Sequence, residues 1–75
     1  MGISKTIHSK DYREIIARLK KARIEAGLRQ EDVAHKLKKP QPYISKIESG
    51  ERRLDVLELK QLIKIYKKSA DYFIN

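Results

Sequence analysis

The fold of this chain is decided by residues 30–50, which read QEDVAHKLKKPQPYISKIESG. Their apolar residues form two groups at helical spacing, one on each side of residues 38–40: Val33, Ala34 and Leu37, then Ile44 and Ile47. Each apolar stripe is too narrow to support a helix alone, so the two predicted helices must pack on each other and on the rest of the chain. Ala34 is small enough to let them approach closely, and Gly50 suits the left-handed backbone that ends a helix. The pattern therefore predicts a helix-turn-helix.

This stretch resembles the Cro/C1-type family of phage and bacterial repressors, also called XRE. The resemblance covers about residues 15–74 and is carried by Gln30-x-x-Val33-Ala34-x-x-Leu37, Gln41 and Ile44-Ser45-x-Ile47-Glu48-x-Gly50. It is specific, because a generic pair of helices would not place Gln30, Glu48 and Gly50 between the apolar residues. It implies an all-α, compact five-helix, lambda-repressor-like domain. The chain departs from the family pattern in the turn, where Lys38 replaces the usual glycine and Lys39-Pro40 replaces a small polar pair.

The composition limits the function classes. At 75 residues the chain has room for one domain with a small core. Eighteen Lys and Arg against ten Asp and Glu give a formal charge of +8, which favours nucleic acid or an acidic membrane surface as partner. There is no cysteine, so no disulfide or thiolate metal site is available and the composition suits the cytoplasm. No apolar run reaches the length of a signal peptide or membrane span, so we expect neither secretion nor insertion.

Local signals predict the remaining elements. Residues 1–8 show no helical period and predict a flexible N-terminal arm before a domain at 9–75. Ser9 is the expected cap of a helix over about 10–26, and Gly27 ends it. Asp55 predicts the cap of a helix over about 55–67, whose wide apolar face covers the other helices, and Ser69 precedes a last short helix.

The turn inside the motif has two unusual features. Lys38 takes the place where a left-handed residue is expected, which costs a residue other than glycine on the order of 1 kcal/mol. Gln41 precedes Pro42 and is therefore expected to avoid helical backbone angles. This predicts that the second helix of the motif begins at Gln41 or Pro42.

The sequence argues against an enzyme or a metal protein. Ser45 beside Lys46 is the only pair that suggests a nucleophile and base, and both lie on one turn of an exposed helix, so we expect no catalytic residue. His8 and His35 have no cysteine near them and are predicted to be surface residues, so no metal and no cofactor are expected. A membrane-surface role would need a long amphipathic helix. Only the helix over 10–26 qualifies, and its apolar stripe is needed for the core.

The resemblance implies double-stranded DNA as the partner and assigns roles by position. Base contacts are expected from Gln41, Pro42, Ser45 and Lys46. Phosphate contacts are expected from Arg29, Gln30, Lys39, Tyr43, Ser49, Arg52 and Arg53. Two alternatives stay open here: Gln30 only caps its helix, and Tyr43 packs on the domain surface.

Two structural expectations follow. The resemblance implies a buried ion pair between Arg23 and Glu48, the alternative being two exposed charges. Tyr72, Phe73 and Ile74 are consecutive and apolar in a helix too short to bury them all, which predicts a homodimer interface there. In the alternative, Phe73 and Ile74 cap the core and Tyr72 lies on the surface.

The expected function is sequence-specific transcriptional regulation, most simply repression, by a homodimer on a palindromic operator. Within the family the alternatives are an antitoxin that represses its own operon and a controller of restriction-modification genes. A protein-interaction module is the alternative from another class.

Overall fold

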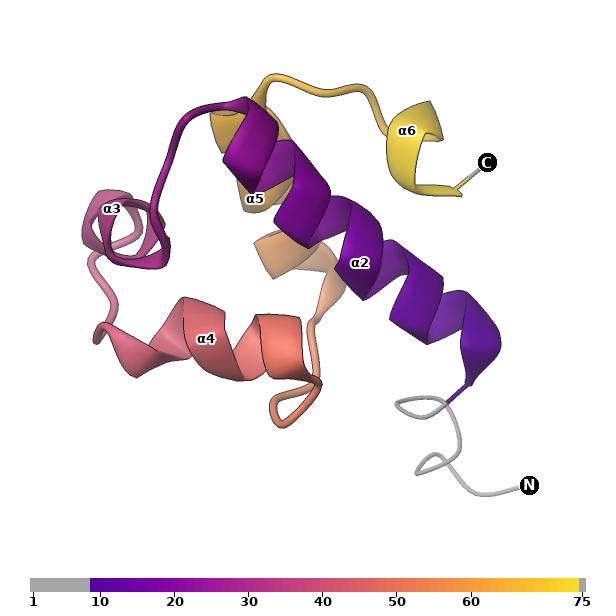
Figure 1. Cartoon of the computed structure of the whole chain (residues 1–75), viewed down its shortest axis with the longest axis horizontal. Helices are drawn as coiled ribbons and strands as arrows, with labels where there is room; N and C mark the ends of the chain where they lie inside the picture. Colours follow the sequence, from indigo (N-terminus) through magenta and orange to yellow (C-terminus); the bar gives the residue numbers. More distant parts are fainter. Residues whose placement is uncertain (1–8, 75) are drawn as a thin grey trace.

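The computed structural model describes residues 9–74, and within them the chain is all helical (Figure 1). The elements are α2 (Lys10–Glu25), α3 (Gln30–Lys36), α4 (Pro42–Ser49), α5 (Val56–Tyr66) and α6 (Asp71–Ile74). The predicted all-α, five-helix architecture is confirmed. The proposed arm over residues 1–8, with His8, lies outside the described residues, as do Asn75 and the side chain of Ile74.

Local capping sets the limits of α2. The Ser9 hydroxyl accepts a hydrogen bond from the backbone N–H of Tyr12 at 3.1 Å, which satisfies one of the free donors at the helix start. The helix ends at Glu25, one residue before the predicted end. Gly27 then adopts a left-handed φ of +74°, and the N–H of Leu28 donates to the carbonyl of Arg23 at 3.2 Å. The predicted glycine stop is therefore confirmed.

The turn between α3 and α4 keeps its predicted strain at Lys38, whose φ is +57°. The N–H of Lys39 closes the end of α3 by donating to the carbonyl of Ala34 at 2.9 Å. The expectation that Gln41 avoids helical angles is wrong, because its φ of −52° and ψ of −42° are helical. A hydrogen bond of 3.0 Å from the N–H of Tyr43 to the carbonyl of Pro40 holds Gln41 in this turn and overrides the preference of a residue before proline. The helix itself begins at Pro42, as predicted.

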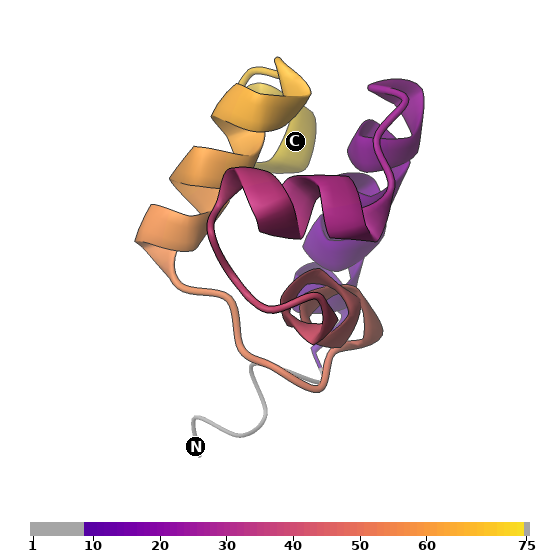
Figure 2. The same cartoon turned by 90° about the vertical axis from the view of Figure 1, so that its left-hand side faces the viewer.

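The core lies where α2, α3, α4 and α5 meet, and α6 packs against α2 (Figures 1 and 2). Its most deeply buried large side chains are Leu19, Val33, Ile44, Ile47, Leu62 and Phe73. Burying each contributes roughly 1.5 to 3 kcal/mol. Ala26, which follows the last residue of α2, is exposed. Between residues 9 and 74 no helix combines the length and apolarity needed to cross a membrane.

Candidate nucleic-acid interface

A buried ion pair holds the helix-turn-helix to α2. The Nε of Arg23 lies 2.7 Å from Oε2 of Glu48, and its Nη2 lies 3.2 Å from Oε1. The two side chains are 11% and 5% exposed. Arg23 also donates to the carbonyl of Leu28 at 2.8 Å, so both charges are paired and hydrogen-bonded rather than exposed. The C-terminal half of α4 is thereby fixed to α2 and to the α2–α3 loop.

Gln30 belongs to the same network. Its Nε2 donates to Oε1 of Glu48 at 2.9 Å, which joins the first residue of α3 to α4. The start of α3 is capped by other residues, since the N–H of Arg29 donates to Oδ2 of Asp32 at 2.8 Å. Gln30 therefore links the two helices instead of capping its own, and the motif is held by a polar contact as well as by the core.

The four residues expected to contact bases lie on the exposed side of α4 and at its start. Gln41 precedes the helix, Pro42 is its first residue, and Ser45 and Lys46 follow one turn later. The opposite face of α4 is buried through Ile44 and Ile47. Within residues 9–74 no hydrogen bond or ion pair engages the side chains of Gln41, Ser45 and Lys46. These polar groups are available to a ligand.

Next to this face, Tyr43 forms a cluster that joins α4 to α5. Tyr43 is 8% exposed, and its hydroxyl donates to Oε2 of Glu58, a carboxylate at the start of α5. Nη1 of Arg52 lies 2.7 Å from the same oxygen, and its guanidinium stands 4.7 Å from the centre of the Tyr43 ring. The ammonium of Lys39 lies 5.5 Å from that ring centre. Tyr43 thus packs into the domain, and in the free protein its hydroxyl donates its hydrogen bond to Glu58.

The cluster shifts the titration of its own members. Burial, followed by the hydrogen bond to Glu58, raises the pKa of Tyr43 to about 12. Burial alone would raise the pKa of Glu58. Hydrogen bonds from Arg52, from Tyr43 and from the backbone N–H of Asp55 outweigh it and hold that pKa below its usual value. At neutral pH the cluster therefore contains an ionised carboxylate, a neutral phenol and a charged guanidinium.

Glu58 was missed in the sequence analysis. Asp55 and Glu58 cap each other, because the Asp55 side chain accepts from the N–H of Glu58 at 2.8 Å and the Glu58 side chain accepts from the N–H of Asp55 at 2.9 Å. The spacing Asp-x-x-Glu before an apolar run is the signal of such a capping box and predicts the local pair. It does not predict the contact with Tyr43, which is distant in sequence.

Of the other residues expected to contact phosphates, some already pair with a carboxylate in the free protein and some do not. Arg29 is exposed and pairs with Asp32 at 3.2 Å and with Glu31 at 3.9 Å. The Ser49 hydroxyl lies 2.9 Å from Oε2 of Glu51. Arg53 is exposed, and none of the ion pairs in the described chain includes it. Pro40, Pro42, Tyr43, Lys46 and Arg52 together line a shallow hollow of about 250 Å³ on this side of the domain.

The C-terminal segment buries one of the three residues expected at a dimer interface. Phe73 is 1% exposed and lies in the core, so it offers no surface to a second chain in this conformation. Tyr72 is half-buried, and its ring forms a T-shaped contact with the ring of Phe73 at 4.9 Å between ring centres. The Lys68 ammonium lies 4.7 Å from the centre of the Tyr72 ring. The side chain of Ile74 lies outside the description. Among the described residues, the large exposed apolar ones are Ile24 at 58% and the adjacent Val56 and Leu57 at 79% and 72%.

The histidine and the serine-lysine pair considered for other chemistry are both at the surface. His35, Ser45 and Lys46 are exposed. In the part of the chain that the structure describes, no three His, Asp or Glu side chains gather closely enough to share a metal ion.

Comparison with known families agrees with this geometry. A helix-turn-helix family model matches residues 19–73, which run from the middle of α2 into α6 and include both helices of the motif. A search of curated proteins found no match. The match covers most of the chain and both the Arg23–Glu48 pair and the exposed face of α4. The chain belongs to the Cro/C1-type helix-turn-helix family, or XRE family, of DNA-binding transcriptional regulators.

Proposed function

We propose that this regulator is a repressor that occupies a specific double-stranded operator and thereby excludes polymerase. The observation that carries the proposal is the unengaged polar face of α4, held in place by the buried network of Arg23, Glu48 and Gln30. A helix fits the major groove, and in a helix-turn-helix the residues at the start of the second helix reach the base edges. A fixed helix keeps these side chains in register with the bases.

The chemistry of the face suggests how bases are read. The Gln41 amide can donate to and accept from adenine, and the Lys46 ammonium can donate to guanine. Pro42 offers apolar contact, as to a thymine methyl group, and the Ser45 hydroxyl is less selective. Arg29, Gln30, Lys39, Tyr43, Ser49, Arg52 and Arg53 would contact phosphates and position the helix. Specificity then depends chiefly on Gln41 and Lys46.

Selection of bound sequences from a random duplex pool tests this proposal, followed by gel shifts on the selected and on random duplexes at several salt concentrations. Tight, salt-sensitive binding to one sequence class supports a specific regulator. An antitoxin autorepressor and a restriction-modification controller would bind similarly and are separated by the genes next to the operator. A protein-interaction module would show no salt-sensitive binding to any duplex, and that result would refute the proposal.

We further propose that the protein binds a palindromic operator as a homodimer. One recognition helix reads too few base pairs for selectivity, and paired half-sites lie about 34 Å apart on one face of the duplex. Because Phe73 is in the core, the exposed pair Val56 and Leu57 is the better candidate for the contact between copies than the C-terminal segment.

Sedimentation analysis with the selected palindrome separates the two surfaces. Leu57→Glu should abolish cooperative binding of two chains, whereas Tyr72→Glu should leave it unchanged. The reverse pattern would favour the C-terminal segment. Tight binding of one chain to a single half-site, unaffected by both variants, would refute the dimer.

A further inference from the structure

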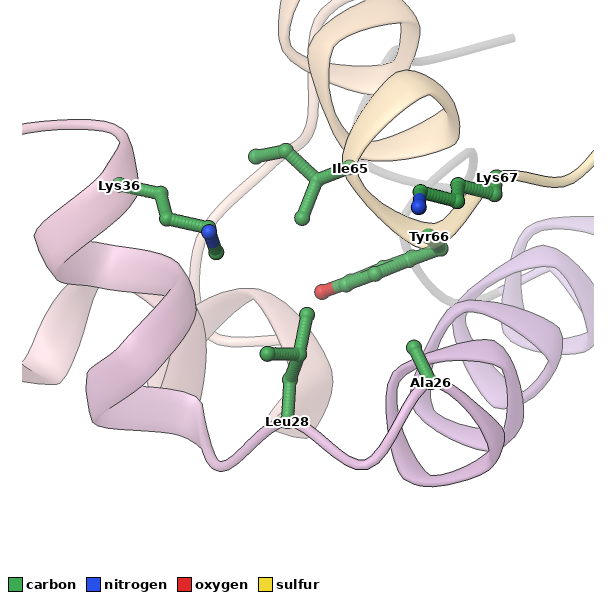
Figure 3. A pocket seen from close by; sticks show the side chains of 6 residues that line it. All are labelled: Ala26, Leu28, Lys36, Ile65, Tyr66 and Lys67. Atoms are coloured by element: carbon green, nitrogen blue, oxygen red, sulfur yellow. The ribbon is translucent and has the colours of Figure 1, made fainter.

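A pocket of about 280 Å³ opens where the C-terminal ends of α2, α3 and α5 approach the α2–α3 loop (Figure 3). Six residues line it: Ala26, Leu28, Lys36, Ile65, Tyr66 and Lys67. None of them belongs to the face proposed to contact DNA. The floor and walls are mainly apolar, while two ammonium groups and a phenol supply the polar atoms.

Tyr66 gives the pocket an unused hydrogen-bond donor. The residue is 3% exposed, and its hydroxyl points into the space between Lys36 and Leu28 (Figure 3). This hydroxyl has no hydrogen-bond partner among residues 9–74. In the described chain, every side-chain nitrogen or oxygen that is fully enclosed does have a partner. The hydroxyl is therefore accessible from the pocket. Burial, reinforced by the charge of Glu48, raises the pKa of Tyr66, so the phenol is a neutral donor at neutral pH.

The two lysines give the pocket a positive rim. Lys36 is the last residue of α3 and Lys67 directly follows α5, and both side chains turn toward the opening (Figure 3). Neither ammonium has an ion-pair partner in the described part of the chain. No carboxylate lines the pocket to balance them. Two ammonium groups and a phenol that can donate thus line one mainly apolar space without a carboxylate, which favours an anion.

We propose that this pocket binds a small amphipathic anion, namely a carboxylate on a short apolar chain. The carboxylate would lie between the two ammonium groups and accept a hydrogen bond from Tyr66, and the chain would pack on Leu28 and Ile65. A volume of about 280 Å³ is small for a ligand site. If each water-sized group takes about 30 Å³, the pocket volume limits the ligand to roughly ten non-hydrogen atoms.

Octanoate has the proposed size and charge and serves as the probe. It is titrated below its micelle concentration into the whole isotope-labelled chain, and amide shifts are followed by NMR. We expect saturable shifts that are largest at Leu28, Lys36 and Tyr66. Octylammonium, which has the same chain and the opposite charge, should bind at least about tenfold more weakly, because its head would face two like charges.

Variants test the individual donors. Tyr66→Phe keeps the ring in the core and should weaken octanoate binding about tenfold, the effect of losing one hydrogen bond to a charged group. Lys67→Gly removes an ammonium, suits the left-handed φ of +57° at this position, and should weaken binding similarly. Lys60→Gln changes an exposed lysine of α5 outside the pocket and should leave the affinity unchanged.

Three results would overturn the proposal: no saturable shift with octanoate, octylammonium binding as tightly as octanoate, or equal affinities for the wild type, Tyr66→Phe and Lys67→Gly. If Tyr66→Phe does not fold, Lys36→Gln replaces it, because Lys36 is exposed and contributes only its ammonium. Loss of affinity in Lys36→Gln and Lys67→Gly but not in Lys60→Gln then supports the site.

Discussion

Removing the carboxylate of Glu48 should cost the domain much of its stability. The Arg23 side chain is 11% exposed, and in Glu48→Ala its guanidinium loses the carboxylate that lies 2.7 Å away, while Gln30 loses its acceptor. Leaving one member of a buried pair uncompensated costs about 3 to 5 kcal/mol. A chain of 75 residues is stable by roughly 4 to 11 kcal/mol in total. Urea denaturation followed by circular dichroism measures this loss of free energy. In a thermal melt the midpoint should fall by about 12 °C or more.

A surface pair in the same molecule provides the matched control. Glu31 lies 3.9 Å from Arg29, with side-chain exposures of 49% and 72%, so Glu31→Ala should change the free energy of unfolding by about 1 kcal/mol or less. If Glu48→Ala lowers the free energy of unfolding by no more than Glu31→Ala does, Arg23 and Glu48 do not form a buried contact in solution and the reasoning fails. Arg23→Met combined with Glu48→Leu should recover much of the loss, because no charge is then left buried alone.

Three further outcomes are expected. The pKa of Glu58 in the folded state lies below its ordinary value of 4.5, so its contribution to stability is present above pH 4.5 and lost as the pH falls through the lower folded value. Glu58→Gln should therefore flatten the decline of stability in acid denaturation curves, and an unchanged acid limb would contradict this. Lys38→Gly should stabilise the domain by about 0.5 to 1 kcal/mol in urea titrations, because glycine tolerates a φ of +57°. Gln41→Ala should reduce the free energy of binding to the selected operator by about 1 to 3 kcal/mol and change binding to random DNA little, whereas Arg53→Ala should weaken binding to both. Gel shifts on the two duplexes measure this. Equal losses of binding to both for Gln41→Ala would refute its role in base readout.

The helices could be predicted from sequence because their limits are set by local signals. Ser9, Gly27 and Asp55 each act on backbone groups within a few residues, and the structure uses all three as expected. Gln41 shows where a local rule fails. Its neighbour Pro42 disfavours helical angles, but the turn closed between Pro40 and Tyr43 decides the conformation.

The candidate site was predicted less completely, because parts of it depend on contacts between distant residues. No local pattern indicates that Glu58 receives hydrogen bonds from both Tyr43 and Arg52, since the three residues meet only when the start of α5 lies next to Tyr43. Phe73 is buried because α6 folds back onto α2, although the segment is too short for its periodicity to indicate which side faces inward.

These contacts divide the cations near α4 into two kinds. Arg52 and Arg29 already pair with Glu58 and Asp32, so a phosphate must compete with an existing carboxylate, and the net gain from each contact is small. Lys46 and Arg53 have no carboxylate partner within residues 9–74, and a phosphate near either one gains the full interaction and releases counterions. The formal charge of +8 does not show where the attraction to DNA acts. Its electrostatic part is expected to depend mainly on the unpaired cations beside the face proposed to read the bases.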